Sequence, residues 1–270
     1  MRMKTKTMIL CSVFLMAATL LFSTENRNKD FPKPKKVKPT SLFSDIDYGI
    51  GMMVSFNQVP IVLNPASQNA QLENTLNFYY SALNLDASFS DYLSLTAIVG
   101  YNINKLRNPL DFINLPLTLR WKDKSVNAPV FGLRVRSDFY SWNDFSVSAS
   151  GTLLFFTTAS AEYPIHLPIV FGNSRFSNHF NQAILEILVK YEGFSNFDVY
   201  AGPQFHAIRG TLTASETIQA LQGREDLTYK QRKTSGLTGG IEFEAGNIDV
   251  DFRITVIAKT TASVTLSYAF

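Results

Sequence analysis

Pairs of charged residues spaced two apart are the positions in this chain that could do chemistry. That spacing places both members of a pair on the same face of an extended strand. Basic pairs and acidic pairs lie apart in the sequence. Two such sets facing one narrow, water-filled space would either pair with each other or select ions. The basic candidates are Arg120, Lys122, Arg134 and Arg136, the acidic ones are Glu242, Glu244, Asp249 and Asp251, and Arg253 lies beside the acids.

An alternation of apolar and polar residues from residue 47 onward gives these charges their setting. Period two is typical of a strand with one apolar and one polar face. Strands of about ten residues with a polar inner face predict an all-β fold, an antiparallel up-and-down transmembrane β-barrel. The twelve expected strands cover residues 47–57, 76–89, 92–103, 115–122, 130–139, 145–157, 163–171, 183–192, 197–209, 235–245, 248–258 and 262–270.

The final strand carries the clearest alternation and ends on an aromatic residue. Val264, Leu266, Tyr268 and Phe270 share one face, and small or hydroxyl residues share the other. This strand resembles the terminal strand of bacterial outer-membrane β-barrels, which the barrel-assembly machinery reads. The resemblance implies that Tyr268 and Phe270 are an assembly signal, that this machinery is a partner during biogenesis, and that outer-membrane lipid surrounds the barrel. Thr265 departs from the class, which often has glycine near this position.

The lengths of the connections agree with a barrel in a Gram-negative-type envelope. Such barrels have even strand numbers, short periplasmic turns and longer outer loops. Segment 210–234 is the longest connection, and residues 211–222 could form a short helix that folds inward or faces outward. Prolines make 163–171 the weakest strand, and ten strands remain the alternative count. The long segments that fall on the expected outer side are 59–75, 104–114, 172–181 and 210–234.

The composition also favours half-apolar strands. Hydrophobic residues make up 46% of the chain and aromatic residues 13%, as expected for strands with interfacial aromatic girdles. Beyond the amino-terminal region, no stretch has about 18 uninterrupted apolar residues. The formal net charge of +3 gives no reason to expect nucleic acid as a partner. A secreted β-sandwich is the alternative fold.

The amino-terminal region has the pattern of an exported protein. Residues 1–23 are predicted to be a signal peptide, because basic residues precede an apolar run from Met8 to Phe22. An uncleaved anchor is the alternative. Residues 24–46 are predicted to be a Lys/Pro-rich periplasmic linker, and residues 47–270 the barrel. Cys11 is the only cysteine, so the exported chain would contain no disulfide.

Catalytic, cofactor and metal sites are not indicated. The histidines are His166, His179 and His206, and His206 lacks the serine two places on that outer-membrane phospholipases carry. Omptin-type proteases use Asp and His near the outer rim, whereas Asp249 and Asp251 are expected at the other end of the strands from His206. No Cys/His metal spacing, phosphate-binding glycine loop or dinucleotide motif occurs. The chain is therefore not expected to be an enzyme, although a barrel hydrolase remains an alternative.

These observations predict a narrow porin-like channel for the passive transport of small polar solutes across the outer membrane. The alternative is a closed structural or adhesive barrel that acts through its extracellular loops. In the first case the two charged sets line a pore, and in the second they form a paired, polar plug.

Overall fold

The computed structural model describes residues 46–65, 72–90, 93–112, 115, 120–121, 125–167, 170–219 and 221–270. The predicted signal peptide and all of the predicted linker except residue 46 lie outside these residues. No helix in the described part of the chain is long and apolar enough to cross a bilayer.

Most of the described residues lie in strands. They are β1 (Asp47–Pro65), β2 (Leu72–Ser90), β3 (Leu93–Leu106), β4 (Leu110–Asp111), β5 (Arg120–Trp121), β6 (Val126–Trp142), β7 (Phe145–Leu167), β8 (Val170–Tyr191), β9 (Phe197–Ile218), β10 (Leu221–Gln231), β11 (Ser235–Ala245), β12 (Ile248–Val256) and β13 (Thr260–Ala269). Strands β4 and β5 pair only with each other, and the remaining eleven described strands form one antiparallel sheet.

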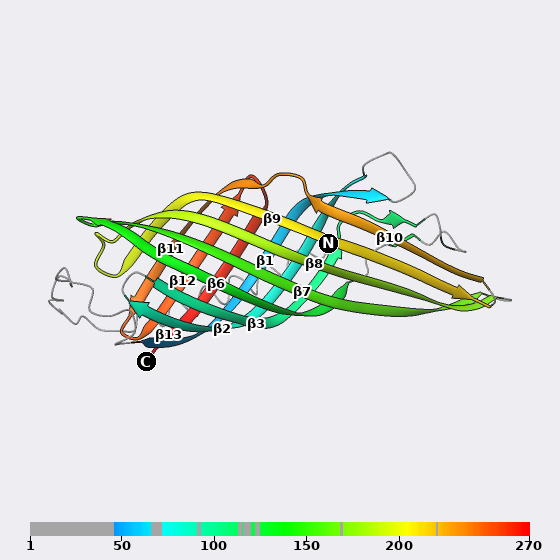
Figure 1. Ribbon diagram of the computed structural model, residues 1–270, viewed down its shortest axis with the longest axis horizontal. Coiled ribbons are helices and arrows are strands. Elements are labelled where there is room, and N and C mark those ends of the chain that lie inside the picture. Colours follow the sequence, from blue (N-terminus) through cyan, green and yellow to red (C-terminus); the bar gives the residue numbers. More distant parts are fainter. Residues whose placement is uncertain are drawn as a thin grey trace, which may run out of the picture. The chain divides into compact units, whose positions relative to one another are not determined.

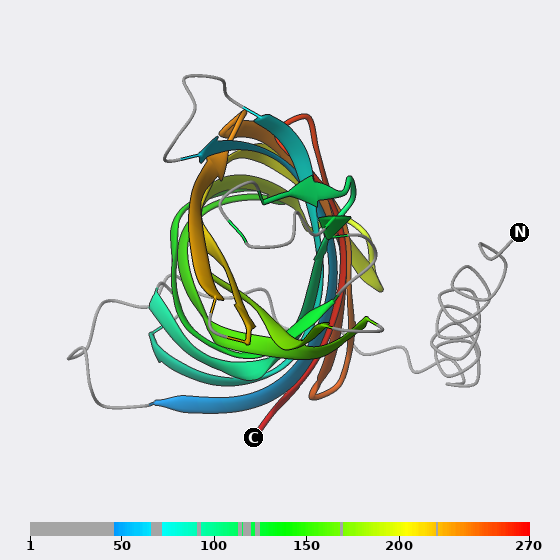
Figure 2. The same cartoon turned by 90° about the vertical axis from the view of Figure 1, so that its right-hand side faces the viewer.

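Ten strands of the sheet close into a ring, because β13 returns to pair with β1 (Figures 1 and 2). The ring runs β1, β2, β3, β6, β7, β8, β9, β11, β12, β13 and back to β1. The predicted all-β up-and-down barrel is confirmed, and the alternative count of ten describes this ring.

The set of strands that forms the barrel wall differs between the two ends of the barrel. We call the end that holds Asp47 and Ala269 the terminal end, and the opposite end the far end. Toward the terminal end, β9 pairs with β11, whereas residues 209–218 of β9 pair with β10. Strand β10 also pairs with residues 61–65 of β1. It therefore takes the place of β11, β12 and β13 in the far half of the barrel.

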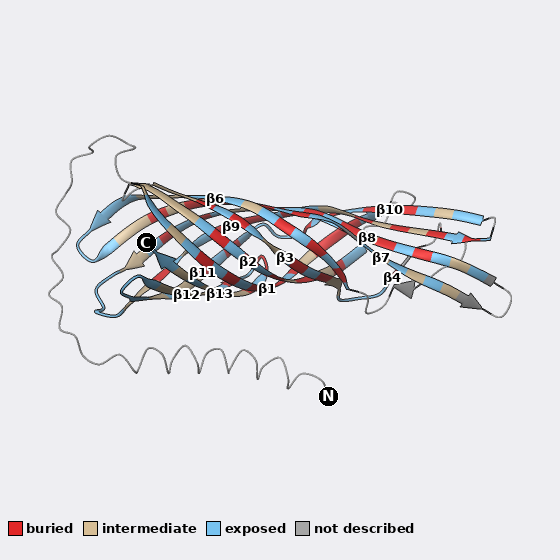
Figure 3. Ribbon diagram, turned by 90° about the horizontal axis from the view of Figure 1, so that it is seen from below, coloured by how far each residue is buried: buried red, intermediate tan, exposed pale blue. Residues whose placement is uncertain are grey.

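The outer face of the barrel is apolar near the terminal end and polar near the far end. On β8, Leu185 and Val189 point outward and are 51% and 47% exposed. Further along the same face of β8, Asn181 and His179 are exposed instead. Figure 3 shows the alternation of buried and exposed residues along the strands. The predicted outward register is confirmed, and the apolar part of the outer face has the character of a lipid-facing band.

The boundary of this band can be tested with two substitutions on one strand. Ile187→Arg should destabilise the barrel by about 2–4 kcal/mol, because a charge near the bilayer midplane must leave water. Asn181→Arg, on the same face of β8 beyond the band, should change stability by less than about 0.5 kcal/mol. Urea unfolding of both variants in lipid vesicles measures the difference. Equal costs would show that Asn181 also faces lipid.

Four predicted elements are wrong. Residues 163–171 are not a separate strand, because Tyr163–Leu167 end β7 and Val170 begins β8. The expected loop 172–181 lies within β8, and 210–234 contains the end of β9 and all of β10 instead of a loop with a helix. In 115–122, residues 120–121 pair with β4 outside the barrel sheet.

These errors share one physical cause. Beyond the membrane the strands continue, but water rather than lipid surrounds them, so the apolar side chains move to the inner face. On β1, Val54 points outward and is exposed, whereas Val59 and Ile61 point inward and are fully buried. The expected loop 59–75 therefore contains the far ends of β1 and β2. Pro164 is tolerated in β7 because β8 is the only described neighbour of residues 159–167.

Candidate functional site

The inside of the barrel is the candidate site, and its terminal half holds a charged network. Arg253 on β12 lies at its centre. Its Nη1 is 2.8 Å from Oε2 of Glu186 on β8, and its Nη2 is 3.3 Å from Oδ2 of Asp251. Its Nε donates a hydrogen bond of 3.0 Å to the Tyr200 hydroxyl, which donates to Asp251. Gln204 donates to Glu186.

A second cation belongs to the same side of the lumen. Nζ of Lys190 on β8 lies 2.7 Å from Oδ2 of Asp198 and 3.0 Å from Oε2 of Glu242. These side chains are 14–21% exposed, so the pairs are largely screened from bulk water. Strands β8, β9, β11 and β12 are consecutive neighbours in the sheet. Glu186, Asp251, Asp198 and Glu242 are therefore paired with cations on their own side of the lumen.

The structure places several of the predicted pore-lining residues in this lumen. Arg134, Arg136, Glu242, Asp249, Asp251 and Arg253 lie on inner strand faces, and Glu244 is exposed at the terminal end. The side chains of Arg120 and Lys122 lie outside the described residues. Of the two predicted charged sets, Arg136 on β6 lies within electrostatic reach of Glu242 on β11. Arg136 pairs with Asp138 of its own strand at 3.2 Å, and Arg134 donates to Thr152 at 3.2 Å.

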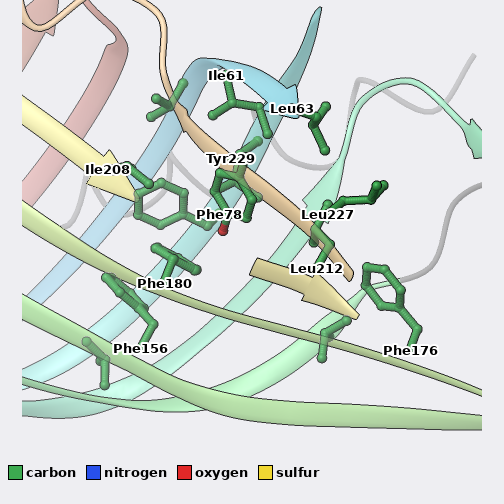
Figure 4. Packing of buried hydrophobic residues seen from close by; sticks show 14 of the residues in the cluster. Ile61, Leu63, Phe78, Phe156, Phe176, Phe180, Ile208, Leu212, Leu227 and Tyr229 are labelled. Carbon is green, nitrogen blue, oxygen red and sulfur yellow. The ribbon is translucent and has the colours of Figure 1, made fainter. Parts of the chain in front are cut away.

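The far half of the lumen is filled with aromatic and aliphatic side chains (Figure 4). Phe156 and Phe180 stack with ring centroids 4.1 Å apart, and Phe78 meets Phe180 edge-on at 5.3 Å. All three are at most 2% exposed. The Tyr229 hydroxyl, on β10, donates to Asn178 Oδ1 at 2.9 Å. We call the packed set Phe78, Phe156, Phe180, Ile208, Leu212, Leu227 and Tyr229 the apolar plug.

The connection between β3 and β6 adds to this packing. Leu110, Phe112 and Leu115 are buried and belong to the same hydrophobic cluster. Phe112 meets Phe176 of β8 edge-on, with ring centroids 6.3 Å apart. The inward-folding segment is therefore this connection, whereas the sequence pointed to residues 210–234.

Known proteins were compared with the chain. No family model matches it, and no curated protein does. Among solved structures, the outer membrane protease OmpT from Escherichia coli has 9% identity and a TM-score of 0.42, covering 84% of this chain and 97% of that one. The β domain of the Bordetella autotransporter BrkA has 8% identity and a TM-score of 0.42, covering 84% and 100%. The COG4313 outer membrane channel from Pseudomonas putida F1 has 10% identity and a TM-score of 0.38, covering 87% and 100%.

At sequence identities this low, the similarity to these solved structures extends to the fold alone. The closed sheet and its apolar outer band decide the class. The chain folds as a transmembrane β-barrel.

The far part of the barrel carries a polar outer surface. Strands β7, β8, β9 and β10 run on beyond the lipid-facing band (Figure 1). At about 3.4 Å per residue, residues 170–181 of β8 extend roughly 40 Å along the strand. The Thr213 hydroxyl donates to Asp226 Oδ1 at 2.5 Å and, with nearby Arg224, lowers the pKa of Asp226. We call these four strand ends the far extension.

The two histidines whose side chains are described lie on opposite faces of the barrel wall. His206 points inward and is 1% exposed, His179 points outward, and the side chain of His166 lies outside the described residues. No group of three or more His, Cys, Asp or Glu side chains in the described part of the barrel could hold a metal ion.

The predicted assembly signal can be tested at the last residue. Phe270 is 70% exposed, and its backbone N–H donates to the Tyr48 carbonyl at 3.0 Å. Because the ladder between β1 and β13 already ends at Ala269, Phe270→Ser should leave the folded barrel intact but lower its yield in the outer membrane. Heat-modifiable mobility on gels measures the yield, with Phe270→Tyr as the aromatic control. Equal yields for both variants would remove the role assigned to Phe270.

Proposed function

We propose that this protein is a closed outer-membrane barrel that acts at the cell surface through its far extension. The observation that carries the proposal is the apolar plug, whose stacked rings fill the lumen on the far side of the charged network. An ion crossing the stacked rings would have to give up much of its hydration shell, because most of the side chains in this layer are apolar. The polar outer face of the far extension supplies a water-exposed surface suited to a structural or adhesive role.

A narrow channel for small polar solutes is the second candidate. Arg134, Glu186 and Arg253 line a polar cavity in the terminal half of the lumen, which favours it. The candidates differ in conductance. Purified barrel in planar bilayers should produce no discrete single-channel currents if it is closed, and steady openings would favour the channel instead.

A role at the cell surface also requires that the far extension lies on the extracellular side of the membrane. Since Cys11 is the only cysteine and lies in the predicted signal peptide, single cysteines can be introduced for labelling. Arg224 in β10 and Ser195 in the turn between β8 and β9 are both exposed, at opposite ends of the barrel. On intact cells, a membrane-impermeant maleimide should label Arg224→Cys, and should label Ser195→Cys only after the outer membrane is permeabilised. The reverse pattern would overturn the proposal.

A further inference from the structure

The cavity in the terminal half of the lumen contains more cationic than anionic side chains. It encloses about 470 Å³, including the space that opens to solvent. Its charged lining residues are Arg134, Glu186, Asp251, Arg253 and Lys259. They come from β6, β8, β12 and the turn between β12 and β13. The barrel therefore gathers three cations and two carboxylates around one small polar space.

Both carboxylates of the cavity already form ion pairs. Glu186 and Asp251 both form ion pairs with Arg253, at 2.8 and 3.3 Å. Arg134 makes one hydrogen bond among the described residues, to the neutral Thr152 hydroxyl. Lys259 lies within electrostatic reach of Glu186 but forms no ion pair or hydrogen bond with any described residue. Arg134 and Lys259 are thus cations of one cavity without a carboxylate of their own.

Lys259 is held inside the barrel by an unusual turn. The N–H of Ala258 donates to the Val256 carbonyl at 3.2 Å, and Ile257 between them has a φ of 81°. These features define a classic γ-turn, which is rare and strained, especially at a β-branched residue. Gln231 donates to the Ala258 carbonyl at 3.4 Å. The turn leaves Ile257 62% exposed on the outside and Lys259 only 4% exposed on the inside.

Neighbouring polar groups next to Lys259 are also unsatisfied. His206 lies within electrostatic reach of Lys259, is 1% exposed, and has the Gln231 side chain as its polar neighbour. The Gln204 and Gln231 side-chain oxygens are buried and have no donor in the described part of the chain. Buried polar groups without partners are costly, and a buried cation without a counter-charge is more so. A bound ligand would remove that cost.

We infer that the lumenal cavity binds a small oxyanion, held between the ammonium of Lys259 and the guanidinium of Arg134. Carboxylate and phosphate oxygens are the groups that such donors recognise, through charge-assisted hydrogen bonds. A monoanion balances the lining when Lys259 is protonated, since the five residues then carry a single excess positive charge. The site does not depend on the proposed surface role, because it requires neither a closed far end nor the far extension.

Calorimetric titration of the purified barrel in an uncharged detergent tests the site. Inorganic phosphate and acetate are the probes, and sodium chloride at matched ionic strength is the reference. At least one probe should bind saturably with one site per barrel. Lys259→Met should weaken that binding by about tenfold or more, because a charge-assisted hydrogen bond is lost. Arg175→Met, which removes an exposed cation of the far extension, should leave the affinity within about twofold.

The urea midpoint of unfolding separates the loss of the site from misfolding of the variant. In buffer without either oxyanion, Lys259→Met should have a higher urea midpoint than the wild type, since it removes an unpaired buried charge. The binding probe should raise the midpoint of the wild type and leave that of Lys259→Met unchanged. Absence of saturable binding beyond the chloride reference, or equal affinity in the wild type and Lys259→Met, would overturn the inference.

Discussion

Phe156→Ala should destabilise the barrel by about 3–5 kcal/mol, the usual cost of removing a fully buried aromatic ring. Phe156 is 2% exposed, stacks on Phe180 and also meets Phe78 edge-on at 5.6 Å. Its loss leaves a cavity that the rigid ring of strands cannot collapse to fill. The same change should open a path for ions past the apolar plug. Urea unfolding in vesicles measures the first effect, and planar-bilayer conductance the second.

The neighbouring residue on the same strand is the matched control. Phe155 points outward from β7 and is 49% exposed. No side chains pack over the outer side of that ring, so Phe155→Ala leaves no internal cavity, should cost less than Phe156→Ala and should leave conductance unchanged. A barrel in which Phe156→Ala is as mild as Phe155→Ala would not be closed by packing at this level, and the channel would become the better candidate.

The lipid-facing part of the fold could be predicted because the membrane imposes a simple rule on the sequence. Each strand that crosses lipid must alternate, with its apolar face outward. The rule places Leu133, Ile187 and Leu266 on the outer face, and all three are exposed there. Pairing of β13 with β1 follows, since a sheet surrounded by lipid must close on itself.

The far half of the fold could not be predicted from that rule, because outside lipid the rule reverses. On β9, Phe205 points outward within the band, whereas Ile208 and Leu212 point inward beyond it. Where the apolar residues move from the outer to the inner face, the alternation in the sequence is interrupted. Such an interruption resembles the end of a strand followed by a loop. The move of apolar residues to the inner face at Val59 and Ile208 is the sequence signal that indicates strands with an apolar core in residues 210–234.

The candidate site was predicted only in part for a related reason. Sequence alternation assigns a side chain to the lumen but does not say which neighbour it meets. Glu242 and Arg253 were therefore found, while their partners Lys190 and Glu186 were not singled out. Those partners are spaced four apart with Leu188 between them, so they do not form a charged pair at spacing two. Their pairing depends on the register between β8, β9, β11 and β12.

Arg253→Met should be the other strongly destabilising change, at about 3 kcal/mol. Removing one partner of a buried ion pair leaves the opposite charge without compensation, which costs about 3–5 kcal/mol in a fully buried site. We expect a cost at the lower end of this range, because the Arg253 side chain is 19% exposed and therefore partly hydrated. Methionine retains most of the volume, so the loss reports the charge rather than a cavity.

The control for this prediction is an ion pair on the far extension. Arg224 lies 3.1 Å from Asp226, but their side chains are 68% and 45% exposed. Arg224→Met should therefore cost about 0–1 kcal/mol.

A double-mutant cycle isolates the contact that Arg253 makes with Glu186. In a Glu186→Gln background, Arg253→Met should cost less than in the wild type, because the stranded carboxylate at position 186 is gone. Strictly additive costs would show that Arg253 stabilises the barrel through Asp251 and Tyr200 alone. A loss for Arg253→Met no larger than that for Arg224→Met would show that the lumen screens its charges as well as the outer surface does. The charged network would then have no part in holding β8 and β12 together across the intervening strands.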